Sequence, residues 1–347
     1  MLQRKKIRLL IVDDSSFFRG VLHRELSKDS SIEIVGTAID AYDARDKIIN
    51  LKPDVLTLDV EMPKMNGIDF LKTLMPQYPI PVVVVSAVSG NVFDALDAGA
   101  VDFVTKPGLN AGENYDTFVQ ELIVKIKIAS TAKVSHYKVI TDRTVSTKKS
   151  NSFHQTSDRV IAIGASTGGT EAIYNVIKDL PRSFPGIVIV QHMPPVFTKM
   201  FAERLNNTCQ MSVKEASDGD VVMAGQVLIA AGDNHMELRK GSGGYYVKCY
   251  SGKKVSGHCP SVDVLFESVA KYAGKRAVGI ILTGMGSDGA KGLLSMRQAG
   301  CFTIGQDEKS CVVYGMPMVA NNIGAVEQQA KLQDIPRILN KYLASNK

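Results

Sequence analysis

The fold of the second half of the chain is decided by the stretch Val160-Ile161-Ala162-Ile163-Gly164-Ala165-Ser166-Thr167-Gly168-Gly169. Its first residues form a continuous apolar run, which is typical of a strand buried on both faces of a parallel sheet. The glycines that follow favour a sharp turn that exposes Ser166 beyond the end of the strand. A strand that passes through such a turn into a helix is the repeating unit of a doubly wound α/β sheet.

Apolar runs of the same kind recur along the whole chain. In the first part they alternate with amphipathic patterns and predict strands at residues 7–12, 32–36, 55–58, 82–85 and 102–105. In the second part they predict strands at residues 160–163, 187–190, 227–230, 278–282 and 302–304. We therefore predict the α/β class, with two doubly wound domains built on mostly parallel sheets.

A polar segment separates the two patterns. Residues 131–157 are rich in Ser, Thr, Lys and His and show no periodicity, which is typical of a flexible linker. We therefore expect one domain in residues 1–130 and a second in residues 158–347. A chain of 347 residues with 45% hydrophobic content is long enough to bury two cores.

The composition indicates a protein of the reducing cytosol. The five cysteines are widely spaced without a Cys-x-x-Cys pair, so neither a disulfide framework nor a zinc site is predicted. The apolar run behind the basic N-terminus is too short for a signal peptide or a membrane segment, so we expect a cytoplasmic protein without membrane insertion.

Charge is distributed unevenly. The first 130 residues carry 15 Lys and Arg against 18 Asp and Glu, and the rest of the chain carries 26 against 17. A basic second half fits either an ordinary solvated surface or attraction to an acidic protein partner. The basic residues are scattered and no nucleic-acid-binding motif is present, so nucleic acid is not an expected partner.

Carboxylates follow two strands of the first predicted sheet. Asp13 and Asp14 close the first strand, and Asp59 closes the third. Because parallel strands present their carboxyl ends at one edge of the sheet, we expect the three side chains to meet there. Mg²⁺ prefers carboxylate ligands together with water and phosphate oxygens, so the group predicts a magnesium site. Asp59 is then a candidate nucleophile toward a phosphoryl group.

Two more polar residues stand at the ends of the neighbouring strands. Ser86 ends the fourth strand and Lys106 follows the fifth, so both are expected to contact the phosphoryl oxygens. Each residue has an ordinary alternative, since aspartates can cap a helix, a serine can belong to a loop and a lysine can lie on the surface. The occurrence of all these features at strand ends, in the expected order, favours a phosphorylation site.

These motifs resemble the receiver domains of two-component response regulators. The resemblance covers roughly residues 5–128 and rests on the Asp-Asp pair, on D-x-x-M-P-x-M-x-G starting at Asp59, on Ser86 and on Lys106-Pro107. It implies a flavodoxin-like (βα)5 fold in which Asp59 is phosphorylated by a histidine kinase and the Asp-Asp pair helps to hold Mg²⁺. It also places Phe103 at the position of the aromatic switch, a ring that could equally be part of the core.

Polar residues also follow three strands of the second domain. Gly164-Ala165-Ser166-Thr167-Gly168 matches G-x-S-x-G, and His192 and Asp288 each follow a predicted strand. The three strand ends therefore offer a serine nucleophile, a histidine base and an orienting carboxylate. His235 and His258 lie in loops of the same domain and are alternative bases. The glycines around Asp288 suit an oxyanion hole made by backbone amides.

The glycines of the turn have a second interpretation. Gly164, Gly168 and Gly169 could form a phosphate-binding loop at a helix N-terminus. Their spacing does not match G-x-G-x-x-G, and the lysine of a P-loop is missing. Ser166 could also be only a helix cap, and Asp288 only a turn residue. The combination of Ser, His and Asp at three strand ends favours a hydrolase.

From about residue 158 to 342 the sequence resembles the catalytic domain of chemotaxis protein-glutamate methylesterases, the CheB family. The matching stretches are I-G-A-S-T-G-G at 163–169, Q-H-M-P at 191–194, P-S-V-D-V-L-F at 260–266 and L-T-G-M-G-x-D-G at 282–289. The resemblance implies that Ser166, His192 and Asp288 are catalytic, and that the backbone amide of Met285 contributes to the oxyanion hole.

The same resemblance implies a function and its partners. The expected activity is the phosphorylation-activated hydrolysis of glutamate γ-methyl esters on chemoreceptors, with release of methanol and with glutamine deamidation as a second activity. A chemotaxis histidine kinase is the expected phosphodonor, and Mg²⁺ is expected only for phosphorylation. Two other classes stay open, namely a response regulator whose second domain only binds a partner, and a nucleotide-dependent enzyme that uses the glycine loop.

Overall fold

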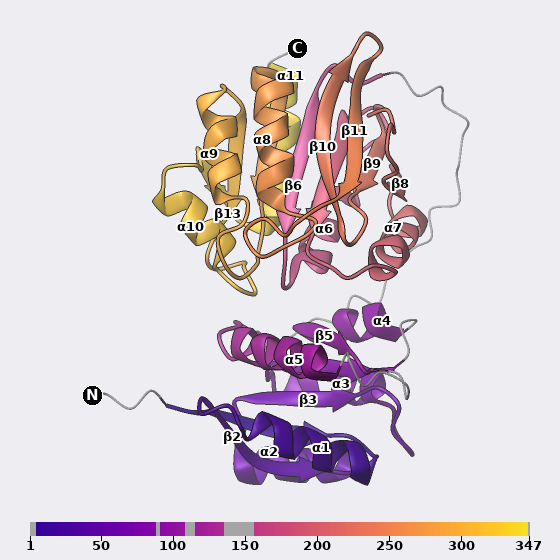
Figure 1. Cartoon of the computed structure of the whole chain (residues 1–347), viewed down its shortest axis with the longest axis vertical. Coiled ribbons are helices and arrows are strands. Elements are labelled where there is room, and N and C mark those ends of the chain that lie inside the picture. The colour runs from indigo at the N-terminus through magenta and orange to yellow at the C-terminus, as the bar shows by residue number, and fades with distance from the viewer. Residues whose placement is uncertain (1–4, 88–90, 108–114, 135–155, 346–347) are drawn as a thin grey trace. The chain divides into compact units, whose positions relative to one another are not determined.

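The computed structural model describes residues 5–87, 91–107, 115–134 and 156–345 and divides into two compact units, Met1–Thr141 and Asp142–Lys347 (Figure 1). Most of the predicted linker, residues 135–155, lies outside the described residues. The predicted bounds of the linker and of the two domains therefore stay predictions. Among the described residues, no helix has both the length and the apolar composition needed to cross a bilayer.

A five-stranded parallel sheet forms the centre of the first unit. The strand order is β2-β1-β3-β4-β5, which is the flavodoxin-like order. The strands are β1 (Ile7–Val12), β2 (Ile32–Ala38), β3 (Val55–Asp59), β4 (Val82–Ser86) and β5 (Asp102–Thr105). Both β3 and β4 are buried along their whole length, which explains why their sequences are apolar without alternation.

Four helices connect these strands and a fifth follows β5, and the first three begin at polar residues that cap them. They are α1 (Ser16–Leu26), α2 (Ala41–Leu51), α3 (Gly67–Gln77), α4 (Val92–Asp97) and α5 (Tyr115–Ala129). The Ser15 hydroxyl accepts the amide N–H of Phe18 at the start of α1. Asp40 and Asn66 cap α2 and α3 in the same way. The predicted receiver-type arrangement of alternating strands and helices is confirmed.

A seven-stranded parallel sheet forms the centre of the second unit. Its order is β14-β13-β12-β6-β7-β9-β8. The strands are β6 (Val160–Ala165), β7 (Gly186–Gln191), β8 (Ser212–Glu215), β9 (Gln226–Ile229), β12 (Ala277–Ile281), β13 (Phe302–Gln306) and β14 (Gln328–Ala330). All five strands predicted for this domain are present, and the short edge strands β8 and β14 are additional.

The sheet reverses its direction of growth between β6 and β12. From β6 the chain moves outward to β7, and it later returns to the other side of β6 with β12 and moves outward to β13. Ligands of such sheets bind beyond the carboxyl ends of the strands at this switch point. Because crossovers between parallel strands are right-handed, the helices after β6 and after β12 cover opposite faces.

Helices and one hairpin surround the second sheet. The helices are α6 (Gly169–Ile177), α7 (Phe197–Thr208), α8 (Val262–Tyr272), α9 (Ala290–Gln298), α10 (Met316–Asn322) and α11 (Ile335–Ser345), with 3₁₀ turns at Gly274–Arg276 and Leu332–Asp334. Figure 1 shows α8 and α9 side by side in front of the sheet, next to the hairpin. Phe266 of α8 is fully buried in a core that also includes Leu238 of the hairpin.

The antiparallel hairpin β10 (Asn234–Gly241) and β11 (Gly244–Ser251) was not predicted. Burial alternates along most of both strands, with Met236, Leu238, Tyr245 and Val247 buried, and His235, which was expected in a loop, is a buried residue of β10. This alternation, with a glycine-rich turn between the strands, is the signal that could have revealed it.

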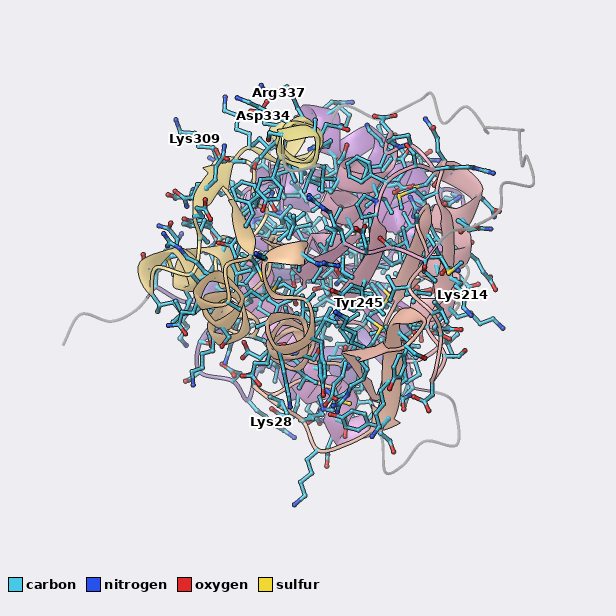
Figure 2. The ribbon with its side chains drawn as sticks, turned by 90° about the horizontal axis from the view of Figure 1, so that it is seen from above. Lys28, Lys214, Tyr245, Lys309, Asp334 and Arg337 are labelled. Carbon is cyan, nitrogen blue, oxygen red and sulfur yellow. The ribbon has the colours of Figure 1, made fainter. Side chains whose placement is uncertain are left out.

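Several charged side chains of the second unit lie at its surface. Lys309 is exposed, and Asp334 and Arg337 form an exposed ion pair at 3.5 Å (Figure 2). Exposed pairs of this kind contribute little to stability, because solvent screens them. This placement is consistent with the solvated surface that the sequence suggested for the excess positive charge.

Candidate active site and phosphorylation site

Three carboxylates meet at one edge of the first sheet. Oxygens of Asp13, Asp14 and Asp59 all lie within 4.8 Å of one another. Asp13 and Asp59 are buried, and Asp14 is exposed. Since Ser15 caps α1, the aspartate pair is not needed for that role. The structure thus brings together the acidic residues that the sequence placed at the ends of two strands.

Among the described residues, one ammonium group contacts this cluster. Lys106 Nζ lies 2.7 Å from Asp13 Oδ2 and 2.6 Å from Asp59 Oδ2. Burial raises the pKa of Asp59, and the neighbouring Asp13 raises it further, although the bonds to Lys106 oppose the shift. One lysine therefore does not offset the negative charge. The all-carboxylate donor set and the uncompensated charge fit a hard divalent cation such as Mg²⁺.

Ser86 and Phe103 occupy the two neighbouring strands. Ser86 is the buried last residue of β4, and its carbonyl accepts the amide N–H of Lys106. Phe103 is buried in β5, with the ammonium of Lys125 4.9 Å from the ring centre. Lys125 also donates to the Phe103 carbonyl at 2.6 Å. Ser86 thus lies at the end of the strand where it was predicted. Phe103 is part of the core, and the ammonium of Lys125 lies against its ring.

Ser166 lies in the turn between β6 and α6. Its amide donates to Thr283 O at 3.0 Å, and its carbonyl accepts the amide of Gly169 at 2.7 Å. Gly168 has a φ of 76°, a left-handed conformation that few other residues adopt. These bonds use the amide of Gly169 inside the turn, which counts against the alternative of a phosphate-binding loop. The Ser166 side chain is partly exposed.

The loop after β12 passes directly over this serine. A Cβ atom at Gly284 would lie only 2.6 Å from the Cβ of Ser166, so a larger residue does not fit there. Gly284 donates to Val313 O and holds the loop in place. The next residue, Met285, has an exposed side chain, and no group among the described residues accepts a hydrogen bond from its amide. That N–H is therefore available as an oxyanion donor.

His192 leaves the sheet next to Ser166 and pairs with Asp288. The register aligns Ala165 with Gln191, so the next residues of the two strands leave the sheet as neighbours. His192 Nε2 donates to Asp288 Oδ2 at 2.8 Å, and both side chains are almost completely buried. His192 Nδ1 is buried and has no hydrogen-bond partner among the described residues. Because Nε2 carries the shared proton, Nδ1 is the nitrogen that can accept a proton from a serine.

The two alternative histidines have other surroundings. His258 stacks on His192 with a centroid distance of 3.6 Å and an interplanar angle of 8°. Burial, followed by the neighbouring His192, lowers the pKa of His258 to about 4, so this ring is neutral at physiological pH. His235 is buried, with Nε2 2.9 Å from Lys253 O and Nδ1 accepting the amide of Ser261. Both nitrogens of His235 are occupied, which excludes it as the base.

Gln191 is a residue of the site that the sequence reasoning missed. Its carboxamide Nε2 donates to Ser166 O at 3.0 Å and to His192 O at 3.1 Å. The side chain is buried and ties together the two turns that carry the candidate nucleophile and base. The sequence offered two signals, namely a polar residue at the end of a completely buried strand and the Q-H-M-P stretch that begins at Gln191.

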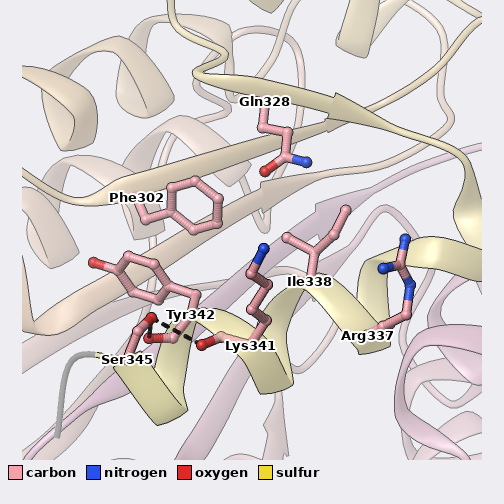
Figure 3. Close-up of a pocket in the computed structure, with 7 residues that line it drawn as sticks. All are labelled: Phe302, Gln328, Arg337, Ile338, Lys341, Tyr342 and Ser345. Atoms are coloured by element: carbon pink, nitrogen blue, oxygen red, sulfur yellow. Dashed lines mark hydrogen bonds between the residues drawn. The ribbon is translucent and has the colours of Figure 1, made fainter.

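A cavity of about 280 Å³ lies elsewhere in the second unit. Its walls come from β13, β14 and α11, and Figure 3 shows Lys341 extending from α11 toward Phe302 and Gln328. Phe302 and Gln328 begin their strands, whereas Ser166 follows the end of β6. In a parallel sheet these are opposite edges, so the cavity is separate from the candidate active site.

Comparison with known proteins places the chain in a family. A family model described as CheB methylesterase matches residues 161–339, which is more than half of the chain. The chain belongs to the CheB methylesterase family. A second model, described as response regulator receiver domain, matches residues 9–112. The family resemblance stated from the motifs is therefore confirmed.

Relatives within the CheB family match over nearly the whole chain. The protein-glutamate methylesterase/protein-glutamine glutaminase 2 of Syntrophomonas wolfei is 59% identical over 98% of both chains. The protein-glutamate methylesterase/protein-glutamine glutaminase of Salmonella typhi is 50% identical over 95% of both chains. The crystal structure of the Thermotoga maritima CheB methylesterase catalytic domain aligns with a TM-score of 0.52 at 38% identity, covering 53% of this chain and 98% of that one.

Proposed function

We propose that the chain is a cytoplasmic esterase that hydrolyses γ-methyl esters of glutamate side chains on chemoreceptors and releases methanol. The observation that supports this most is the buried His192–Asp288 pair beside the Ser166 turn, at the switch point of the sheet. The names of the relatives, which match over nearly the whole chain, support the substrate. They also support deamidation of glutamine side chains as a second activity.

The reaction proceeds by acyl transfer to Ser166. Ser166 Oγ attacks the ester carbonyl carbon while His192 Nδ1 takes the hydroxyl proton. Asp288 stabilises the resulting imidazolium, and the Met285 amide donates to the oxyanion. The C–O bond to the methyl group's oxygen then breaks, and methanol leaves with the proton from His192. Water hydrolyses the acyl-enzyme by the reverse proton transfers and yields the glutamate carboxylate, while a glutamine substrate releases ammonia instead.

Phosphorylation of Asp59 regulates this activity. A chemotaxis histidine kinase is the proposed phosphodonor, and Ser86 and Lys106 contact the phosphoryl oxygens. Asp13, Asp14 and Asp59 would hold Mg²⁺, which would supply positive charge at the phosphoryl group. The modification changes the relative populations of an inactive and an active state of the full chain.

The test measures methanol release from methylated receptor membranes by the purified full-length protein, with and without Mg²⁺ and a small-molecule phosphodonor. We expect release that the phosphodonor stimulates, and no release by the Ser166→Ala variant. Turnover by Ser166→Ala equal to that of the wild type would refute the assignment of the nucleophile. A cellular adaptation phenotype that Ser166→Ala leaves intact would instead support an output domain that only binds a partner.

A further inference from the structure

The carboxylate of Asp288 accepts four hydrogen bonds, and three of them come from one short segment. Besides His192, its donors are the Ser261 hydroxyl at 2.7 Å and the amides of Val262 at 2.7 Å and Asp263 at 3.0 Å. Oδ1 binds Ser261 and Asp263, and Oδ2 binds Val262 and His192. Every acceptor direction of this buried carboxylate is therefore used.

The segment is the start of α8, and its capping is unusual. Ser261 stands at the N-cap position, where a serine side chain ordinarily accepts an amide of its own helix. Here the Ser261 hydroxyl makes no such bond. Asp288 accepts the first two amides of α8 instead, and the Ser261 hydroxyl donates to Asp288. Asp288, from the loop before α9, thus caps α8, and the Ser261 hydroxyl at the cap position donates a hydrogen bond to Asp288 instead of capping the helix itself.

The exchange is reciprocal. The Asp263 carboxylate, in the first turn of α8, accepts the amide of Gly292 in the first turn of α9 at 2.8 Å. Its other oxygen accepts the Ser256 hydroxyl at 3.0 Å. The two helices therefore cap each other with Asp288 and Asp263. We call this arrangement the crossed caps, and it fixes the loop of Asp288 against the start of α8.

On this geometry we propose that Ser261 is a positioning residue for the proposed esterase reaction, acting on His192 through Asp288. The hydroxyl holds Oδ1, so that Oδ2 stays directed at His192 Nε2. The chain Ser261–Asp288–His192 then fixes the tautomer that leaves Nδ1 free to act as the base. Ser261 is completely buried, so a substrate cannot reach its hydroxyl, and its effect is on the orientation of His192 rather than on binding.

The first test compares Ser261→Ala with the wild type in the full-length protein. Loss of a hydrogen bond to a buried charge predicts a fall in kcat of roughly tenfold or more, with KM unchanged. Ser261→Thr keeps the hydroxyl and should restore at least half of the activity. Equal kcat values for Ser261→Ala and the wild type would overturn the proposal, whereas absence of turnover in the wild type would instead refute the proposed function.

A matched control comes from the same helix. The Ser268 hydroxyl is also buried in α8, where it accepts the amide of Leu238 and donates to Leu265 O without contacting Asp288. Ser268→Ala should lower the melting temperature and leave kcat unchanged. If both alanine variants lower kcat equally, the effect is general loss of packing and the proposal fails. Should Ser261→Ala fold poorly, Ser261→Cys replaces the hydroxyl by a somewhat larger thiol whose S–H is only a weak donor, and a fall in kcat is again expected.

A double-mutant cycle separates positioning from structure. If Ser261 acts only through Asp288, the substitution Ser261→Ala should cause no further loss of residual activity in an Asp288→Ala background. The same roughly tenfold loss in both backgrounds would show that Ser261 acts independently of the carboxylate and would overturn the proposal.

Discussion

The substitution Asp288→Asn tests the site most directly, because an asparagine can accept hydrogen bonds at only one of the two oxygen positions. With its carbonyl at the Oδ2 position, it keeps the bonds to His192 and Val262 but turns its NH₂ toward the Asp263 amide. The Ser261 hydroxyl can rotate and accept from that NH₂ group, whereas the Asp263 amide loses its partner. One buried N–H without an acceptor costs about 1–3 kcal/mol of unfolding free energy.

The opposite orientation has a larger effect on the reaction. An NH₂ group at the Oδ2 position would donate to His192 Nε2 and move the ring proton to Nδ1, which removes the base. In both orientations the charge that stabilises the imidazolium is gone. We therefore expect kcat to fall by about 10³–10⁴-fold together with the loss of 1–3 kcal/mol of stability.

Two measurements on the full-length protein check this expectation. Methanol release gives kcat, and urea unfolding followed by far-ultraviolet circular dichroism gives stability, since the chain has no tryptophan to report by fluorescence. Asp334→Asn is the matched control, because the Asp334 carboxylate makes just one contact among the described residues, an exposed ion pair with Arg337, and its replacement should change stability by less than about 0.5 kcal/mol. Wild-type stability together with more than a tenth of the wild-type kcat in Asp288→Asn would refute the reasoning.

Three further predictions concern the Asp288 carboxylate, the Gln191 carboxamide and the Asp59 carboxylate. Burial would raise the pKa of Asp288, but hydrogen bonds from His192 and from α8 outweigh burial and lower it. The ionised carboxylate should therefore stabilise the folded protein fully above about pH 4, and this stabilisation should vanish as pH falls through the lowered pKa. A difference in unfolding free energy between the wild type and Asp288→Asn that is the same at every pH would contradict this. Gln191→Met removes the hydrogen bonds to the carbonyls of Ser166 and His192 and should lower kcat roughly tenfold without changing KM. An unchanged kcat would show that the two turns keep their positions without these bonds. Burial raises the pKa of Asp59, so above that pKa the ionised carboxylate destabilises the folded protein. Asp59→Asn should therefore raise the melting temperature at pH 7 without Mg²⁺, and it should abolish stimulation by the phosphodonor. A lowered melting temperature would contradict the destabilising effect of the Asp59 charge.

The strands and the residues at their ends could be predicted from the sequence. Buried parallel strands require uninterrupted apolar runs, and the polar residues that follow such runs necessarily gather at one edge of the sheet. This reasoning predicted that Asp13 and Asp59 meet, and that His192 and Asp288 lie on loops at the same edge of the second sheet.

Contacts of side chains that do not follow the end of a strand could not be predicted in this way. Ser261 and Asp288 are 27 residues apart, and neither helical nor strand periodicity relates them. Ser261 precedes an apolar helical pattern and therefore resembles an ordinary helix cap, a role that Asp288 takes in its place. The choice of Nε2 rather than Nδ1 as the partner of Asp288 likewise depends on side-chain orientation, which no pattern of residue types encodes.

The crossed caps also limit how such a domain can change during evolution. Residues of active sites commonly reduce stability, so a gene copy released from selection for activity can become more stable as it loses them. Asp288 belongs to the opposite kind, because the start of α8 depends on it. A duplicated copy that lost this carboxylate would lose stability along with activity, and its unfolded fraction would be exposed to proteases. We therefore expect inactive descendants of this fold to disappear from genomes, or to keep an aspartate at this position after the nucleophile itself has been lost.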